Sequence, residues 1–277
     1  MGGRYGGVCE SAKAFRLVFV AVKRCMARAR LPSVFVISIR RNQSRLARAL
    51  ASCAVHGVVV HVIDGIDADH DFHKLKSYRD MLGPDFWGGP EIKPGAFACF
   101  LSHRVAWDAF LRSGEERAIF IEDDGLLTSG RFAAPNSDLV FLNARMAAWS
   151  RAVGSTAAED IVAALAVGFD PGARGLALGP GGDGYFMTRH GAMIASEHSR
   201  VDRIRCGVDW YLLMLGGGVN DPSSSAPAEV KSLWDMYGSK KPVLSSRVAE
   251  PAIVRTGAGP SSIQHSWTVP ISDFFET

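Results

Sequence analysis

The sequence lacks the features of several protein classes. It contains five cysteines, an odd number, and no two of them form a CxxC pair. Because disulfide frameworks use paired cysteines, we expect free thiols and a reducing, cytoplasmic environment. No apolar run approaches the roughly 18 residues that a membrane-spanning helix needs, so we predict no transmembrane segment.

An excess of charge of one sign is also missing. The chain carries 31 basic and 28 acidic residues, a formal net charge of +3. That charge does not indicate a nucleic-acid-binding protein, so no nucleic-acid partner is expected. Hydrophobic residues make up 47% and charged residues 21% of the 277 positions, as in ordinary globular proteins. Without repeats or linkers, the simplest division is one domain, residues 31–277, with an N-terminal extension, residues 1–30.

The N-terminal extension is basic and amphipathic. Residues 11–30 contain no acid, and on a helical wheel Phe15, Val18, Phe19, Val22 and Met26 share one face, with most of the basic residues opposite. This pattern predicts a helix lying on an anionic membrane surface. A solvated helix and a tail left by a misassigned start codon are the alternatives.

The first half of the chain alternates strand and helix patterns. Residues 34–39 and 58–63 are β-rich apolar runs, and between them a helix is expected to start at Asn42 or Ser44 and end near Gly57. This β-α-β order predicts an α/β protein with a mostly parallel sheet flanked by helices. The other predicted strands are 118–121, 138–142, 185–188 and 248–254, and the other predicted helices are 95–112, 157–167, 189–197 and 207–215.

Two long connections interrupt these patterns. Residues 64–94 are polar and rich in Gly and Pro, so they form a candidate functional loop. Residues 216–230 carry little apolar material and are expected to be mobile.

Three consecutive acids follow the predicted strand 118–121, namely Glu122, Asp123 and Asp124. In open α/β sheets, ligands bind beyond the C-terminal ends of the strands. Alternate residues of an extended segment point the same way, so Glu122 and Asp124 are expected to converge. Such carboxylates are natural ligands of Mn²⁺ or Mg²⁺, which would in turn neutralise a diphosphate. The alternative is an acid-rich helix start favoured by the helix dipole.

Several motifs together resemble glycosyltransferase family 25, which comprises lipooligosaccharide galactosyltransferase-like enzymes of bacteria and, in animals, collagen galactosyltransferases. The motifs are VFVISIRRNQSRLARAL, IDGID, KPGAFACFLSHRVAWDAF and AIFIEDD, followed by the weaker GDGYFMTRHGAMIA and GVDWYLLM. The resemblance covers roughly residues 33–270, and the combination of CFLSH and FIEDD is its most specific part.

The resemblance implies a GT-A-type fold and an inverting glycosyltransferase, commonly one that transfers galactose from UDP-galactose with a divalent metal. The implied acceptor is a hydroxyl of a lipooligosaccharide or another glycan, which could be lipid-linked. The protein would then be cytoplasmic or peripheral at the inner face of the bacterial inner membrane, held there through residues 11–30. The alternatives are transfer to a small molecule or protein, and a non-catalytic nucleotide- or glycan-binding protein with this fold.

The sequence departs from the family pattern at two places. An apolar β-branched residue usually follows the acid triplet, whereas here Gly125 follows it, and residues 150–184 form an unusual Ala- and Gly-rich stretch. Both departures lie near the expected sugar and acceptor positions.

The resemblance also implies roles for metal and nucleotide ligands. Asp124 matches the metal-binding position, and Glu122 would bind the metal or the ribose. Apart from the resemblance, His265 in the C-terminal stretch SSIQHSW is a further candidate metal or phosphate ligand, with an ordinary surface histidine as the alternative. Asp123 is expected to be structural and to cap the following turn.

Candidate nucleotide-binding residues follow the first two strands. They are Ser38, Arg40 and Arg45 after the first strand and Asp64 and Gly65 after the second. A βα junction can receive a phosphate, and arginine gives bidentate contacts. The alternatives are a solvated basic helix face and a glycine that simply makes a turn.

An inverting transfer needs one general base. Asp209 matches the family's late aspartate and Asp183, in a Gly-rich loop, is the alternative, while Asp209 could equally cap a helix. His103 lies on an apolar helix face, where it is either a core residue or a contact to the diphosphate or acceptor. Aromatic residues that could stack on sugars, or simply pack, are Trp87, Trp210 and Tyr211.

Overall fold

The computed structural model describes residues 31–132, 136–257 and 267–275. The chain divides into two units, Met1–Leu31 and Pro32–Thr277, and only the second is considered below. The predicted amphipathic helix at 11–30 and the candidate ligand His265 lie outside the described residues. Among the described helices, none has both the length and the apolar character needed to cross a bilayer.

A six-stranded sheet in the order β2-β1-β4-β7-β6-β8 forms the centre of the second unit. β7 alone runs against the other strands. The predicted α/β class, with a mixed, mostly parallel sheet flanked by helices, is therefore confirmed and is consistent with a GT-A-like fold. The strands are β1 Ser33–Ser38, β2 Val60–Asp64, β4 Arg117–Glu122, β6 Leu139–Phe141, β7 Gly184–Thr188 and β8 Ser246–Val248.

Both faces of the central strands are buried. In β1, Phe35 and Ile37 pack into one hydrophobic cluster and Val34 and Val36 into another on the opposite face. All six residues of β1 are buried, which explains the nearly continuous apolar run that marked this strand in the sequence.

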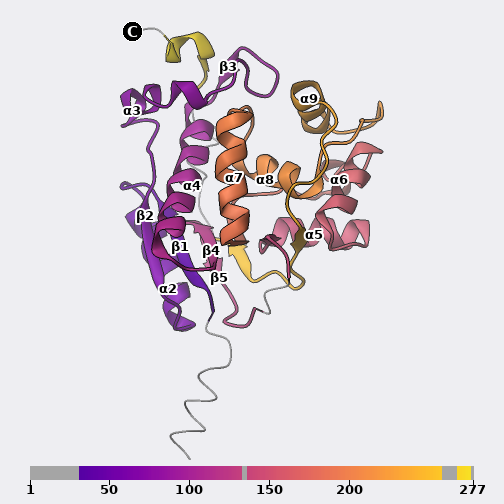
Figure 1. Cartoon of the computed structure of the whole chain (residues 1–277). Helices are drawn as coiled ribbons and strands as arrows, with labels where there is room; N and C mark the ends of the chain where they lie inside the picture. The colour runs from indigo at the N-terminus through magenta and orange to yellow at the C-terminus, as the bar shows by residue number, and fades with distance from the viewer. Residues whose placement is uncertain (1–30, 133–135, 258–266, 276–277) are drawn as a thin grey trace, which may run out of the picture. The chain divides into compact units, whose positions relative to one another are not determined.

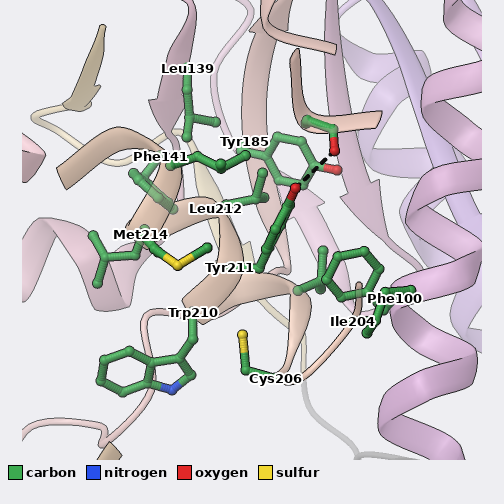
Figure 2. Close-up of a cluster of buried hydrophobic side chains, with 14 of the residues drawn as sticks. Phe100, Leu139, Phe141, Tyr185, Ile204, Cys206, Trp210, Tyr211, Leu212 and Met214 are labelled. Atoms are coloured by element: carbon green, nitrogen blue, oxygen red, sulfur yellow. Dashed lines mark hydrogen bonds between the residues drawn. The ribbon is translucent and has the colours of Figure 1, made fainter. Parts of the chain in front are cut away.

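Helices α4 Pro94–Ser113, α7 Arg189–Val201 and α8 Val208–Gly217 cover the face with the larger cluster, and α4 lies beside α7 (Figure 1). Figure 2 shows part of this cluster, in which Tyr211 of α8 lies near Phe100 of α4. The opposite face is covered by α2 Gln43–Val55. Beside α2 lies a two-stranded sheet of β5 Gly125–Leu127 and β9 Val254–Thr256.

The remaining elements are short or lie outside the sheet. They are α3 Phe72–Lys76, η1 Arg79–Met81, β3 Glu91–Ile92, α5 Ala144–Val153, α6 Ala158–Ala166, η2 Gly172–Arg174, α9 Ala228–Tyr237, β10 Val269–Pro270 and η3 Ile271–Phe274. The sequence patterns did not predict α5 or α9. The single strand predicted at 248–254 is wrong, because β8 and β9 occupy its two ends and belong to different sheets.

The reversed strand β7 brings a distant loop to the acid triplet. Gly184, its first residue, lies opposite Ile121 of β4 in the antiparallel register. The start of β7 therefore shares a sheet edge with the end of β4. The glycine-rich segment 181–184 consequently meets Glu122 and its neighbours.

Candidate active site

The acid triplet lies at the end of β4. Glu122 is the last residue of that strand, Asp123 and Asp124 make the turn, and Gly125 begins β5. Despite their adjacency, the three carboxylates have different hydrogen-bond partners and different surroundings.

Asp123 is held by three donors. Ser38 Oγ and Asn42 Nδ2 donate to its Oδ2 over 2.8 and 3.1 Å, and Arg45 Nη2 lies 2.7 Å from its Oδ1. Asn42 occupies the N-cap position of α2 but makes no side-chain cap bond. Buried Asp123 therefore ties the acid turn to the β1–α2 junction, and the predicted nucleotide ligands Ser38 and Arg45 bind it in this structure.

Only one of the two carboxylate oxygens of Asp124 has a partner among the described residues. Arg45 Nη2 lies 3.0 Å from its Oδ2, whereas its buried Oδ1 has no hydrogen-bond partner among the described residues. Burial raises the pKa of Asp124 to about 7, helped by repulsion from Glu122 and opposed by the charge of Arg45. An orphaned buried carboxylate oxygen is costly unless a cation or donor completes it.

Asp183 faces the same space from the start of β7. Thr256 Oγ1 donates to its Oδ2 over 2.6 Å. Its buried Oδ1 has no hydrogen-bond partner among the described residues, and Arg145 Nη2 is 3.6 Å away. Burial raises the pKa of Asp183, although Arg145 favours its charged form.

Asp209 lies in the first turn of α8. Its Oδ2 accepts a hydrogen bond of 3.2 Å from the backbone N–H of Gly181. Burial raises the pKa of Asp209, and backbone hydrogen bonds from Trp210 and Gly181 oppose the rise. The carboxylate is thus oriented by the glycine-rich segment and is easier to protonate than an exposed one.

These carboxylates line one cavity of ≈ 340 Å³. Glu122, Asp124, Asp183 and Asp209 contribute to its wall, together with the guanidinium of Arg145. The structure therefore gathers two of the three metal candidates of the sequence, Asp124 and Glu122, and both base candidates around one space. A smaller cavity of ≈ 70 Å³ shares Cys99 and Glu122 with it and is also lined by Ser38, Arg45 and His103.

His103 is fully buried and hydrogen-bonded at both ring nitrogens. Its Nδ1 lies 2.7 Å from the Tyr185 hydroxyl, and its Nε2 lies 3.4 Å from Glu122 Oε1. Burial raises the pKa of Glu122, but His103, Arg145 and Arg45 together outweigh it, so the pKa is lowered. His103 is thus both a core residue and a direct partner of a cavity acid.

The other predicted nucleotide residues form a separate group. Arg40, Asp64 and Gly65 line another cavity of ≈ 270 Å³. Arg40 Nη2 and Asp64 Oδ2 form an exposed ion pair of 2.8 Å. Gly65 donates its N–H to Ser38 O over 2.8 Å. The structure does not bring Arg40 or Asp64 into the carboxylate cavity.

Two residues of this site were missed in the sequence. Arg145 is the cavity's arginine, and Asn143 fixes the glycine-rich segment by donating to Gly181 O over 2.9 Å. Asn143 Oδ1 also caps α5 by accepting from the N–H of Met146 over 2.9 Å. An asparagine directly after the predicted strand 138–142 is a helix-start signal that points to both residues.

The cavity residues fit a hard divalent cation. Mg²⁺ and Mn²⁺ are usually bound by one or two carboxylates, waters and substrate phosphates. Asp124 Oδ1 and Asp183 Oδ1 are such carboxylate oxygens, buried and short of donors. A second group, Cys99, His103 and Glu122, has ligand atoms within 4.8 Å of one another. Burial raises the pKa of the Cys99 thiol well above its ordinary value, and this sulfur suits softer metals.

Comparison with known proteins gives a partial match. Residues 31–150 match the family model "Glycosyltransferase family 25 (LPS biosynthesis protein)". "Probable inactive glycosyltransferase 25 family member 3" of Rattus norvegicus is 33% identical over 95 residues, which are 33% of this chain and 17% of the rat protein. "Inactive glycosyltransferase 25 family member 3" of Mus musculus is also 33% identical over 95 residues, 33% of this chain and 16% of the mouse protein.

The matched segment thus spans about a sixth of these relatives' length. The segment that matches the family model, residues 31–150, contains β1, α4 and the acid triplet Glu122–Asp124, which carry the most specific motifs. The resemblance to glycosyltransferase family 25 is therefore confirmed for residues 31–150.

Proposed function

We propose that this protein is a metal-assisted, inverting glycosyltransferase that moves a sugar from a UDP-sugar to a hydroxyl group. The family match supports glycosyltransferase activity in general. The observation that carries the specific proposal is the pair of orphaned buried oxygens, Asp124 Oδ1 and Asp183 Oδ1, in a cavity lined by further acids. A cavity so rich in negative charge favours a cation over a free anionic ligand.

Asp124, with Asp183 or Glu122, would hold the Mn²⁺ or Mg²⁺. When bound, such an ion supplies Lewis-acid stabilisation of the negative charge on a diphosphate leaving group. Arg145, on the cavity wall and 34% exposed in its side chain, supplies a guanidinium that can bind phosphate oxygens.

Asp209 is the proposed general base. It would take the proton of the acceptor hydroxyl as that oxygen bonds to the anomeric carbon. The bond from the anomeric carbon to the diphosphate breaks at the same time, and its electron pair leaves with UDP. The N–H of Gly181 aims one Asp209 oxygen, and burial favours proton uptake by this carboxylate.

The finer substrate assignments rest on the family resemblance. They are galactose as the transferred sugar, a lipooligosaccharide or other lipid-linked glycan as the acceptor, and contact with the inner face of a bacterial inner membrane through residues 11–30. A small molecule or a protein is the alternative acceptor.

A second candidate function is nucleotide or glycan binding without turnover. The names of the rat and mouse relatives describe those proteins as probably inactive and inactive, which favours a binding function as the alternative. The carboxylate cavity favours the enzyme, because a binding protein has no need for an oriented base such as Asp209.

Asp124→Asn distinguishes the two functions. We would measure melting temperature and sugar transfer with a panel of UDP-sugars, with and without Mn²⁺. A transferase predicts stabilisation by one UDP-sugar plus Mn²⁺, and turnover that Asp124→Asn abolishes. The matched control is Asp235→Asn, which changes an exposed acid of α9 that does not line the cavity.

Each other outcome contradicts the proposal at a different point. Stabilisation by a nucleotide without turnover in the unaltered protein would support the binding function. If no UDP-sugar changes the melting temperature, the proposed donor site is wrong. If the Asp124→Asn variant still transfers sugar, Asp124 is not a required metal ligand.

A further inference from the structure

A strained two-residue turn lies at the rim of the carboxylate cavity. Phe86 N donates to Gly89 O over 3.0 Å and Gly89 N donates to Phe86 O over 3.1 Å, so Trp87 and Gly88 form the tip. Their φ angles are 56° and 72°. Positive φ at both central residues is the requirement of a type I′ turn.

Tryptophan is a poor residue for the first of these positions. Type I′ turns favour asparagine, aspartate or glycine there, because a bulky side chain at positive φ is strained. Among the described non-glycine residues, only Trp87 and Arg203 have positive φ. Strain of this kind persists where surrounding structure enforces it, and it concentrates at binding sites.

The surrounding structure does enforce it. Asp85, next to the turn, forms a two-pronged ion pair with Arg205, with both contacts at 2.5 Å. The backbone N–H of Trp87 also donates to the backbone oxygen of Arg205 over 2.8 Å. Arg205 lies just before α8, so the turn is anchored to the segment that leads into Asp209.

Trp87 lines the cavity, and Val208 and Asp209 are also part of its wall. Its ring meets Trp210 edge to face, with centroids 5.9 Å apart at 89°. Trp210 belongs to the core cluster around Tyr211 (Figure 2) and in turn contacts Trp149 at 6.0 Å. An edge-to-face contact leaves at least one face of the Trp87 indole unstacked by Trp210, and the residue is only partly buried.

We propose that Trp87 is a platform for the acceptor saccharide, with its indole face stacked on the apolar C–H face of a pyranose ring. The proposal rests on the proposed transferase function, because Asp209 defines the acceptor side of the cavity. A planar aromatic ring supplies contact area at low entropic cost, while neighbouring carboxylates can accept hydrogen bonds from sugar hydroxyls. The strained turn is then a cost in stability that presents the ring to the substrate.

Trp87→Asn separates this role from simple packing, because asparagine suits the turn but offers no ring. We would measure melting temperature and the binding of methyl β-galactopyranoside and methyl β-glucopyranoside by saturation-transfer NMR. The expected result is an unchanged or higher melting temperature with at least tenfold weaker binding of the pyranoside. Trp87→Phe, which restores an aromatic ring, should recover most of the binding.

Arg203→Asn is the matched control, because it relieves a similar φ of 60° at an exposed position that does not line the cavity. It should leave pyranoside binding unchanged. A lower melting temperature of Trp87→Asn with unchanged pyranoside binding would show that Trp87 only packs. Failure of the unaltered protein to bind either pyranoside would also overturn the platform.

Failure of this proposal can be told from failure of the proposed function. The response to UDP-sugar and Mn²⁺ should be the same in Trp87→Asn as in the unaltered protein. If that response and turnover are present but the KM for the acceptor is unaffected by Trp87→Asn, the transferase stands and the platform does not. If pyranosides bind through Trp87 without any turnover, the platform stands and the transferase does not.

Discussion

The hydroxyl of Tyr185 donates its proton to Nδ1 of His103, across 2.7 Å. The indole N–H of Trp107, which can only donate, lies 2.8 Å from the same oxygen. The buried proton of Tyr185 still needs an acceptor, and His103 Nδ1 is the acceptor within hydrogen-bond distance among the described residues, so the tyrosine accepts from Trp107 and donates to the imidazole. In the neutral ring Nε2 then carries the proton and donates towards Glu122, 3.4 Å away. A buried chain of donors thus ends on a cavity carboxylate.

Tyr185→Phe should disturb this chain without emptying the core. The Trp107 N–H and His103 Nδ1 both lose a buried partner, so we expect about 2–6 kcal/mol less stability, from unsatisfied groups costing about 1–3 kcal/mol each. Loss of the Tyr185 donor at Nδ1 leaves the Glu122 carboxylate as the one remaining hydrogen-bond partner of the ring among the described residues, so we expect the Nε2-protonated tautomer of His103 to be less strongly favoured. Urea unfolding measures the first effect, and ¹⁵N NMR of the histidine ring measures the second.

Tyr211→Phe is the matched control for this experiment. Tyr211 is also fully buried, and its hydroxyl donates to Ala195 O over 2.9 Å. It should reduce stability but leave the His103 tautomer unchanged. If both variants leave the tautomer as it is, the assigned direction of the Tyr185–His103 bond is wrong.

The sequence predicts the sheet far better than the site. Apolar runs such as 34–39 are explained by burial on both faces, so period and composition sufficed to find β1. Asp183 reaches the acids for a reason that no local pattern contains, namely that β7 runs antiparallel to β4. Strand direction is set by packing over long sequence separations. Convergence of Asp183 with Asp124 could therefore only be guessed from the glycine-rich segment.

The hydrogen-bond partners of individual side chains are even harder to predict from the sequence than the strand directions. Asn42 has the type and position of a helix cap, yet its amide is used by Asp123, 81 residues away. Arg145 escaped notice because α5 was not predicted, and a lone arginine carries no chemical signal. Local propensity names the residue but does not choose between local and distant partners.

Asp124 makes stability depend on pH in a direction opposite to that of a salt-bridged surface acid. Its pKa is about 7 in the folded protein against 3.8 for an ordinary aspartate. Below pH 4 the carboxyl is protonated in both states, and between pH 4 and 7 the folded state holds the extra proton. The stability contribution is thus full below pH 4, falls as the pH rises and is lost above pH 7.

Asp124→Asn, neutral at every pH, should therefore be more stable than the unaltered protein above pH 7 and similar to it near pH 4. Three pKa units set a ceiling of about 4 kcal/mol on the difference. Urea unfolding at several pH values without divalent cations measures it. A difference that does not change with pH would contradict the raised pKa. Mn²⁺ should reverse the order by stabilising only the protein with Asp124, because ligand binding favours the native state.

The two base candidates can be separated by their different partners. We expect Asp209→Asn to lower kcat by at least about 100-fold, the usual range for a lost general base. Binding of Mn²⁺ and UDP-sugar should persist in that variant. Asp183→Asn should weaken Mn²⁺ binding first, because Asp183 Oδ1 is one of the orphaned oxygens. The reverse pattern, with metal affinity lost in Asp209→Asn and kcat alone lost in Asp183→Asn, would exchange the two roles.

Gly125 is required by space and not by backbone conformation. It is not among the glycines with positive φ, but a Cβ there would lie 2.4 Å from Asp183 O and 3.1 Å from Glu122 O. Both neighbours are backbone atoms, so they cannot move aside as a flexible side chain could. The departure from the family's β-branched residue is therefore coupled to the close approach of the glycine-rich segment.

Gly125→Ala should consequently push the acid turn away from β7. Overpacking costs about 1–3 kcal/mol, and we expect at least that loss in urea unfolding, with a further loss for Gly125→Val. Because the displacement separates Asp124 from Asp183, Mn²⁺ affinity should fall together with stability. The matched control is Gly89→Ala, where the nearest atom would be 3.7 Å away and little change is expected. Unchanged stability and Mn²⁺ affinity in Gly125→Ala would mean that the backbone of segment 181–184 can shift at little cost in free energy. Its approach to the acids would then not explain the glycine.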